Sequence, residues 1–172
     1  MEKRGKKCIP FQAAFAAVSA LGCLFHFLYR ISGSNPAVGL FTSVSESTWE
    51  HMKLLFFPMV LYIIVQWILC GRSSSGYLPA MTKGLLLGLC FIPTAFYTYT
   101  GVLGRNHFIA DILIFFISVW LSIRTGEKQL QKYPYAGHAL NISAIIILLC
   151  LTAMFIGFTY RPPYAPIFIS PV

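Results

Sequence analysis

The sequence has few charged residues and very few acidic ones. Charged residues make up 10% of the 172-residue chain, and Asp and Glu together number five, whereas about 25% of a typical soluble protein is charged. Hydrophobic residues make up 57% of the chain and occur in long blocks. This composition excludes an ordinary soluble domain and is typical of a protein that crosses a membrane several times.

The motifs that identify common enzymes and cofactor sites are also missing. The sequence contains no HExxH, GxSxG, P-loop, GxGxxG or CxxC pattern. Its five cysteines have no spacing typical of a disulfide framework, and we interpret them as small apolar residues. The net charge of +8 does not indicate nucleic-acid binding, because Lys and Arg lie between the apolar blocks rather than along one face.

Five apolar blocks are long enough, or nearly so, to cross a bilayer, which takes roughly 20 helical residues. They cover residues 9–29, 54–70, 84–103, 108–123 and 139–160. The second and fourth blocks are short, and we expect the polar turns at 45–53 and 105–107 to extend them. The basic start followed by the first block resembles a signal peptide. Because that apolar run continues through Tyr29 and four more blocks follow, we interpret it as an uncleaved helix.

The sequence therefore predicts an all-α fold, with residues 1–172 forming a single membrane domain of about five transmembrane helices. A cytoplasmic N-terminus would place nine of the thirteen Lys and Arg residues in inner segments and four in outer segments. This bias predicts that the N-terminus is cytoplasmic and the C-terminus extracytoplasmic. The predicted location is the cell membrane, with the lipid bilayer as surroundings and a membrane-protein partner or a homo-oligomer as open alternatives.

Polar residues gather at the predicted outer end of this bundle. Two overlapping S-x-x-E patterns, Ser43/Glu46 and Ser47/Glu50, are typical of a helix start. Asp111 lies inside the fourth apolar block, where a carboxylate needs a partner or a function. A salt bridge, or a hydrogen bond from Tyr97, would be a structural explanation for Asp111. The candidate ligand-binding or polar-cluster residues are Glu46, Glu50, His51, Asn106, His107 and Asp111.

A divalent metal ion is one alternative for the cofactor of this cluster. Histidine and carboxylate side chains are common metal ligands, and His107 and Asp111 would share one helical face. Such an ion could activate water for hydrolysis. The candidate metal ligands are His26, His51, His107 and Asp111.

Two long motifs resemble those of a family of small bacterial multi-pass membrane proteins that is known only as a domain of unknown function. The first comprises Gly39-Leu40-Phe41, Val44, Glu46-Ser47 and Trp49-Glu50-His51-Met52-Lys53 with the apolar residues through Pro58. The second comprises Phe96-Tyr97-Thr98-Tyr99-Thr100-Gly101, Leu103-Gly104, Asn106 and Asp111-Ile112-Leu113. The resemblance implies an integral membrane protein of the bacterial envelope and implies no activity. The chain differs from the family pattern at Ser45, where Asn is usual, and in its tail after Pro162-Pro163.

Three classes of function remain open from the sequence. The first is a membrane protein whose outer cluster is structural or binds a ligand or partner. The second is an intramembrane metal-dependent hydrolase or transferase. The third is a small proton-coupled carrier or ion-pathway protein, because chains of carboxylates and histidines can relay protons.

Overall fold

The computed structural model describes residues 9–69 and 74–170, and it is all-α. Its elements are α1 (Phe11–Ile31), α2 (Pro36–Gly39), α3 (Thr48–Leu69), α4 (Tyr77–Leu103), α5 (Phe108–Lys132), α6 (His138–Tyr160) and the 3-10 turn η2 (Pro166–Phe168). Five of these helices are long and apolar enough to cross a membrane. The all-α prediction with five transmembrane helices is therefore confirmed. Residues 3–7 and Arg72, which entered the orientation prediction, lie outside the described residues.

The helices extend beyond the apolar blocks at several ends. Helix α3 begins at Thr48, inside the polar turn that precedes its apolar block. Helix α4 begins at Tyr77 instead of Gly84, and α5 continues to Lys132 instead of ending at Ile123. The extra turns of α5 contain good helix formers and reach Tyr133, which precedes Pro134. Hydropathy detects the apolar part of a helix and misses these polar ends.

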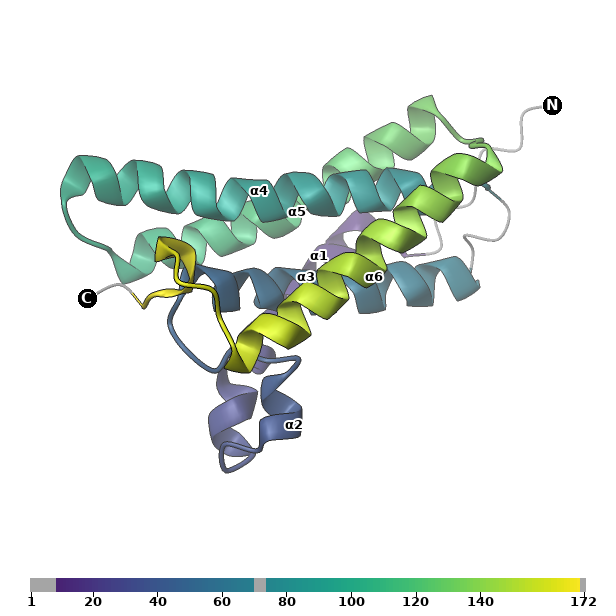
Figure 1. Ribbon diagram of the computed structural model, residues 1–172. Helices are drawn as coiled ribbons and strands as arrows, with labels where there is room; N and C mark the ends of the chain where they lie inside the picture. Colours follow the sequence, from purple (N-terminus) through teal and green to yellow (C-terminus); the bar gives the residue numbers. More distant parts are fainter. Residues whose placement is uncertain (1–8, 70–73, 171–172) are drawn as a thin grey trace.

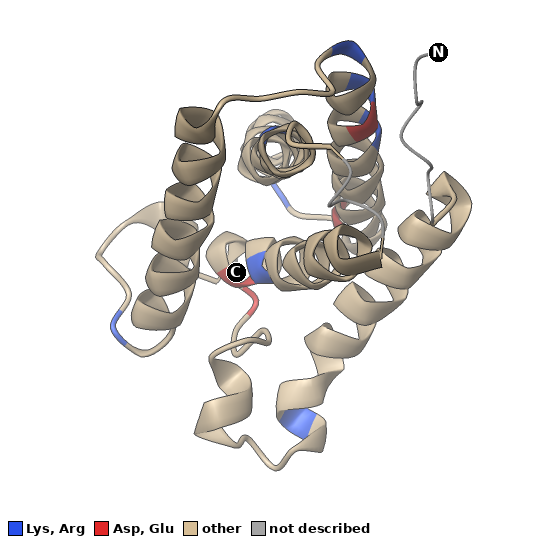
Figure 2. Cartoon of the chain, turned by 90° about the vertical axis from the view of Figure 1, so that its right-hand side faces the viewer, with Lys and Arg blue, Asp and Glu red and all other residues tan. Residues whose placement is uncertain are grey.

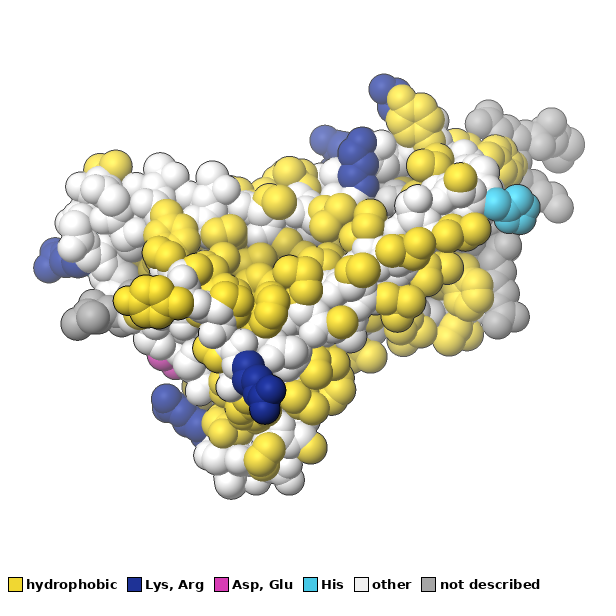
Figure 3. Space-filling model, in the orientation of Figure 1, with side chains coloured by type: hydrophobic (Ala, Val, Ile, Leu, Met, Phe, Trp, Pro, Cys, Tyr) yellow, Lys and Arg dark blue, Asp and Glu magenta, His cyan; other side chains and the backbone are white. Residues whose placement is uncertain are grey.

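Helix α3 is the central helix of the bundle. In its most apolar stretch 61% of the residues are buried, compared with 11% in α6. Leu55, Phe56 and Met59 of α3 are fully buried and belong to the main hydrophobic core. Apolar side chains also cover much of the outer surface over the middle of the bundle (Figure 3). An apolar surface of this extent is expected where helices face lipid.

Helices α4 and α5 lie side by side as an antiparallel pair (Figure 1). Two glycines allow their backbones to approach closely. A Cβ atom on Gly84 would lie 2.2 Å from the carbonyl oxygen of Ser122, and one on Gly88 would lie 2.0 Å from the Ser122 Oγ. Small residues serve this purpose in membrane helices, and here the contact is within one chain.

One end of the bundle, which we call the α2 end, contains the C-terminal ends of α1, α4 and α6 and the start of α3 and α5 (Figure 1). The segment between α1 and α3, including α2, projects there. The tail after α6 turns back over the start of α3, where Trp49 stacks against Phe155, Phe158 and Phe168 with ring centroids 4.6, 5.7 and 4.9 Å away. Figure 2 shows that acidic residues are few in this chain.

Candidate functional site

The start of α3 and the loop before it position three of the predicted polar residues, Glu46, Glu50 and His51. The Ser47 Oγ accepts a hydrogen bond from the backbone N–H of Glu50 at 3.3 Å, which is one half of the predicted capping box. Ser43 instead donates to the carbonyl oxygen of Ser45 at 2.8 Å. The helix therefore begins after Ser47, which leaves Glu46 in the preceding loop. Glu50 and His51 fall in the first turn, about 100° apart around the helix axis.

Glu50 points into the protein and forms a buried ion pair with Lys53. The Lys53 Nζ lies 2.8 Å from the Glu50 Oε2, and the two side chains are 0% and 4% exposed. The ammonium group also donates to the carbonyl oxygen of Gly39 and to the Thr159 Oγ1, both at 2.9 Å. The backbone N–H of Val44 donates to the Glu50 Oε2 at 3.0 Å. This pair joins α2, α3 and α6 and satisfies all three ammonium donors.

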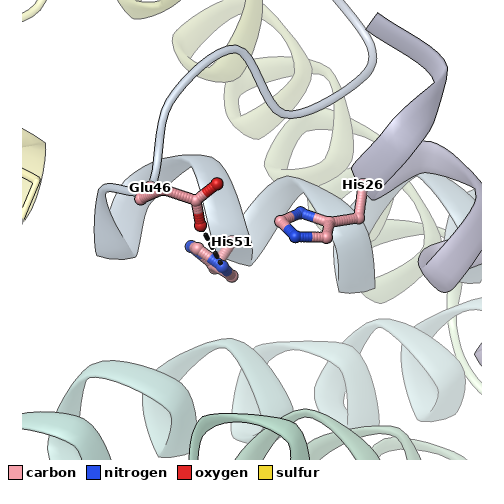
Figure 4. Close-up of side chains that lie close together, drawn as sticks. All are labelled: His26, Glu46 and His51. Atoms are coloured by element: carbon pink, nitrogen blue, oxygen red, sulfur yellow. Dashed lines mark ion pairs between the residues drawn. The ribbon is translucent and has the colours of Figure 1, made fainter. Parts of the chain in front are cut away.

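His51 faces a different group, formed with Glu46 and His26 (Figure 4). One potential metal-ligand atom from each residue lies within 4.8 Å of the other two. The His51 Nε2 is 3.5 Å from the Glu46 Oε2, and the two imidazole centroids are 5.5 Å apart. The three side chains come from α1, the loop before α3, and α3 itself. Among the described residues, this is the group of His, Cys, Asp and Glu side chains whose spacing suits a metal ion.

Hydrogen bonding determines which nitrogen of His51 faces this group. The His51 Nδ1 lies 3.0 Å from the carbonyl oxygen of Ser47. Because a carbonyl oxygen only accepts, the Nδ1 carries the proton and donates. The Nε2 then faces Glu46 either as a protonated imidazolium nitrogen or as a free lone pair that can bind a metal ion. The Nδ1 of His26 is buried and has no hydrogen-bond partner in the described structure.

The group is open to its surroundings on one side. The side chains of Glu46 and His51 are 55% and 33% exposed. Arg30, one turn after His26 on α1, places its Nη2 3.9 Å from the Glu46 Oε1, and its side chain is 81% exposed. That distance is long for a hydrogen bond, so the contact is a loose surface ion pair of small energy.

The remaining predicted residues lie at the turn between α4 and α5. Gly104 ends α4 with a φ of 69°, a left-handed conformation that favours glycine. Asp111 accepts a hydrogen bond from the Tyr99 hydroxyl, and that hydroxyl accepts one from the backbone N–H of His107 at 3.2 Å. The side chains of Asn106 and His107 are exposed. Tyr99 is therefore the partner of Asp111 where the sequence suggested Tyr97.

The structure thus divides the predicted cluster into three parts: the ion pair of Glu50 with Lys53, the group of His26, Glu46 and His51, and the turn between α4 and α5 with Asp111. Of the four candidate metal ligands, His26 and His51 lie together, while His107 and Asp111 are outside their group. Glu46 completes the set, although the sequence offered it only as a polar-cluster residue. The position of Lys53 three residues after Glu50 is a sequence signal for their ion pair, because helical side chains at this spacing can meet. No sequence signal links Glu46 to His26, because that contact depends on how the loop from α1 to α3 folds.

Comparison with known proteins assigns a family and no activity. No curated protein and no solved structure matches this chain. The model of one family matches residues 4–172, which is nearly the whole chain. The chain therefore belongs to the family of unknown function DUF6512.

Proposed function

We propose that this multi-pass membrane protein binds a divalent transition-metal ion, with Zn²⁺ as the best fit, through His26, Glu46 and His51. The observation that carries the proposal is the convergence of two imidazoles and a carboxylate, from three separate segments, within 4.8 Å. Two His and one Glu are an established ligand set for zinc sites that keep a fourth position open. The open side of the group leaves room for water or another ligand there.

The hydrogen bond from His51 to Ser47 supports metal binding over a simple ion pair. Histidines that bind metal ions commonly donate their other ring N–H to a carboxylate or a backbone carbonyl, which fixes the ring and its tautomer. His51 has this arrangement, with its Nδ1 3.0 Å from the Ser47 carbonyl oxygen and its Nε2 directed toward Glu46. Among the described residues the buried Nδ1 of His26 has no hydrogen-bond partner, so this nitrogen is also available to a metal ion.

The spacing of the ligands also suits a metal ion. Zinc binds nitrogen and oxygen at about 2.0–2.2 Å, so the ligand atoms of a tetrahedral site lie roughly 3.3 Å apart. The His51–Glu46 separation of 3.5 Å is close to this value. The ligand atom of His26 lies within 4.8 Å of those of Glu46 and His51.

The proposed membrane topology places this site on the outer side of the cell membrane. The excess of Lys and Arg in the segments at the opposite end supports a cytoplasmic N-terminus and an extracytoplasmic α2 end. A metal ion held there would be exchanged with the extracytoplasmic space.

The contacts of Glu50 and Asp111 favour neither hydrolysis nor transport. A metal-dependent hydrolase of this ligand type uses a separate carboxylate as general base, and the neighbouring Glu50 is held by Lys53 and Val44. A carrier would need titratable groups along a path, whereas Asp111 is bound to Tyr99 at the turn between α4 and α5.

The test is a metal-binding measurement on protein purified in mild detergent without chelator. We expect close to one zinc per chain by elemental analysis, and a Zn²⁺ affinity at least about tenfold weaker in each of His26→Ala, Glu46→Gln and His51→Ala. His107→Ala is the matched control, because His107 is exposed at the same end and lies outside the group. The proposal fails if the wild type binds no divalent ion, or if His107→Ala loses zinc as His51→Ala does.

A further inference from the structure

We infer that the metal-loaded site binds a phosphate group, with one phosphate oxygen in the open coordination position and Arg30 donating hydrogen bonds to the others. This inference rests on the proposed metal site and names its ligand. It assigns a role to Arg30, whose guanidinium lies beside Glu46.

Arg30 is placed to contact a ligand of the metal ion. It follows His26 by four residues on α1, so the two side chains share a helical face. Its Nη2 is 3.9 Å from the Glu46 Oε1, too far for a strong hydrogen bond, and its side chain is 81% exposed. A guanidinium has five N–H donors, and the 81% exposure of the Arg30 side chain leaves donors free to contact a ligand.

Counting charges shows what an occupied site would attract. With both histidines neutral, the positive charge of Arg30 and the negative charge of Glu46 cancel. A divalent ion then gives the group a net charge of +2 with one coordination position open. An anion that contacts both the metal ion and Arg30 would neutralise this charge in a partly exposed setting, where the attraction is strengthened by the nearby low-dielectric bilayer.

A phosphate group matches both partners. Guanidinium groups bind phosphate through parallel N–H···O bonds, and metal ions bind and polarise phosphoryl oxygens. The group lies where α1 ends and α3 begins, which in a membrane is the level of the lipid headgroups. The same chemistry has two sources, the headgroup of an anionic phospholipid and free inorganic phosphate.

The inference is tested on zinc-loaded protein from which excess metal has been removed by gel filtration. Two probes are used: inorganic phosphate, measured by calorimetry, and short-chain phosphatidic acid, measured by native mass spectrometry against phosphatidylcholine. We expect at least one probe to bind in a zinc-dependent manner. Preference for phosphatidic acid identifies the lipid source, and preference for inorganic phosphate identifies the free source.

Arg30→Gln should weaken binding of the preferred probe by at least about tenfold and leave the zinc content unchanged. Arg161→Gln is the matched control, because Arg161 is also exposed and follows α6 at the α2 end. If the wild type binds zinc but neither probe, or if chelation or Arg30→Gln leaves probe binding unchanged, the inference is overturned and the metal site stands. If the wild type binds no zinc, the proposed function itself is overturned.

Discussion

Removing the ammonium group of Lys53 should strongly destabilise this protein. In Lys53→Met the carboxylate of Glu50 stays buried and keeps only one of its two observed hydrogen-bond donors, the backbone N–H of Val44. The carbonyl oxygen of Gly39 and the Thr159 hydroxyl lose their donor as well. Methionine fills a volume similar to that of the lysine stem, so the change removes charge and hydrogen bonds more than packing.

The expected magnitude follows from the burial of the pair. Breaking a buried ion pair by removing one partner costs about 3–5 kcal/mol, because an uncompensated charge remains. Replacing both charges removes that penalty, and the pair itself contributes little net stability when compared with uncharged residues. Glu50→Gln/Lys53→Met should therefore be more stable than Lys53→Met alone, by about 2 kcal/mol or more. Such rescue does not arise if the two side chains act independently.

The assay is reversible unfolding in mixed detergent, or the thermal unfolding midpoint in mild detergent where unfolding is irreversible. Lys83→Met is the matched control, since Lys83 is exposed on α4, and it should change stability by less than about 0.5 kcal/mol. The reasoning is refuted if Lys53→Met is as stable as the wild type, or if the double variant loses as much stability as the sum of the single variants.

Three further predictions follow from other contacts. Gly88→Ala should lower the unfolding midpoint, because its Cβ would lie 2.8 Å from the Ser118 carbonyl oxygen. Gly101→Ala has open space around it and should leave stability unchanged or raise it by up to about 1 kcal/mol. Equal effects of the two substitutions would contradict the close packing of α4 on α5. Tyr99→Phe removes the hydrogen bond to Asp111 and should cost about 1–3 kcal/mol in unfolding experiments. Asp111→Asn keeps an oxygen that can accept this bond and should cost less, and neither change should alter zinc affinity. Zinc affinity should fall as the pH is lowered from 7.5 to 5, because a protonated imidazole cannot bind metal. An affinity that is constant over this range would exclude histidine ligands.

The sequence predicts the helices well because membrane burial leaves a strong local signal. Every apolar block corresponds to a helix, since a chain in lipid must satisfy its backbone hydrogen bonds internally. The helix ends are less well predicted, as the start of α4 and the end of α5 show. Those turns are polar or mixed, and their helical state depends on packing between helices more than on hydropathy.

The site is predicted only in part, for a geometric reason. Hydropathy and helix register indicate how deep a residue lies in the membrane, so the level shared by His26, His51, His107 and Asp111 can be deduced from the sequence. Lateral position depends on helix packing and on the fold of the loop before α3. The structure brings Glu46 to the two histidines of α1 and α3, and it directs Asp111 to Tyr99.

The central claim, that His26, Glu46 and His51 hold one metal ion, is tested most directly by zinc X-ray absorption spectroscopy of the purified protein. The account predicts two imidazole nitrogens and at least one oxygen at about 2.0–2.2 Å, with the imidazole signal reduced in His51→Ala and unchanged in His107→Ala. A sulfur shell at about 2.3 Å would place the ion on cysteine and contradict the account. An imidazole signal that keeps its full wild-type amplitude in both His26→Ala and His51→Ala would contradict it as well.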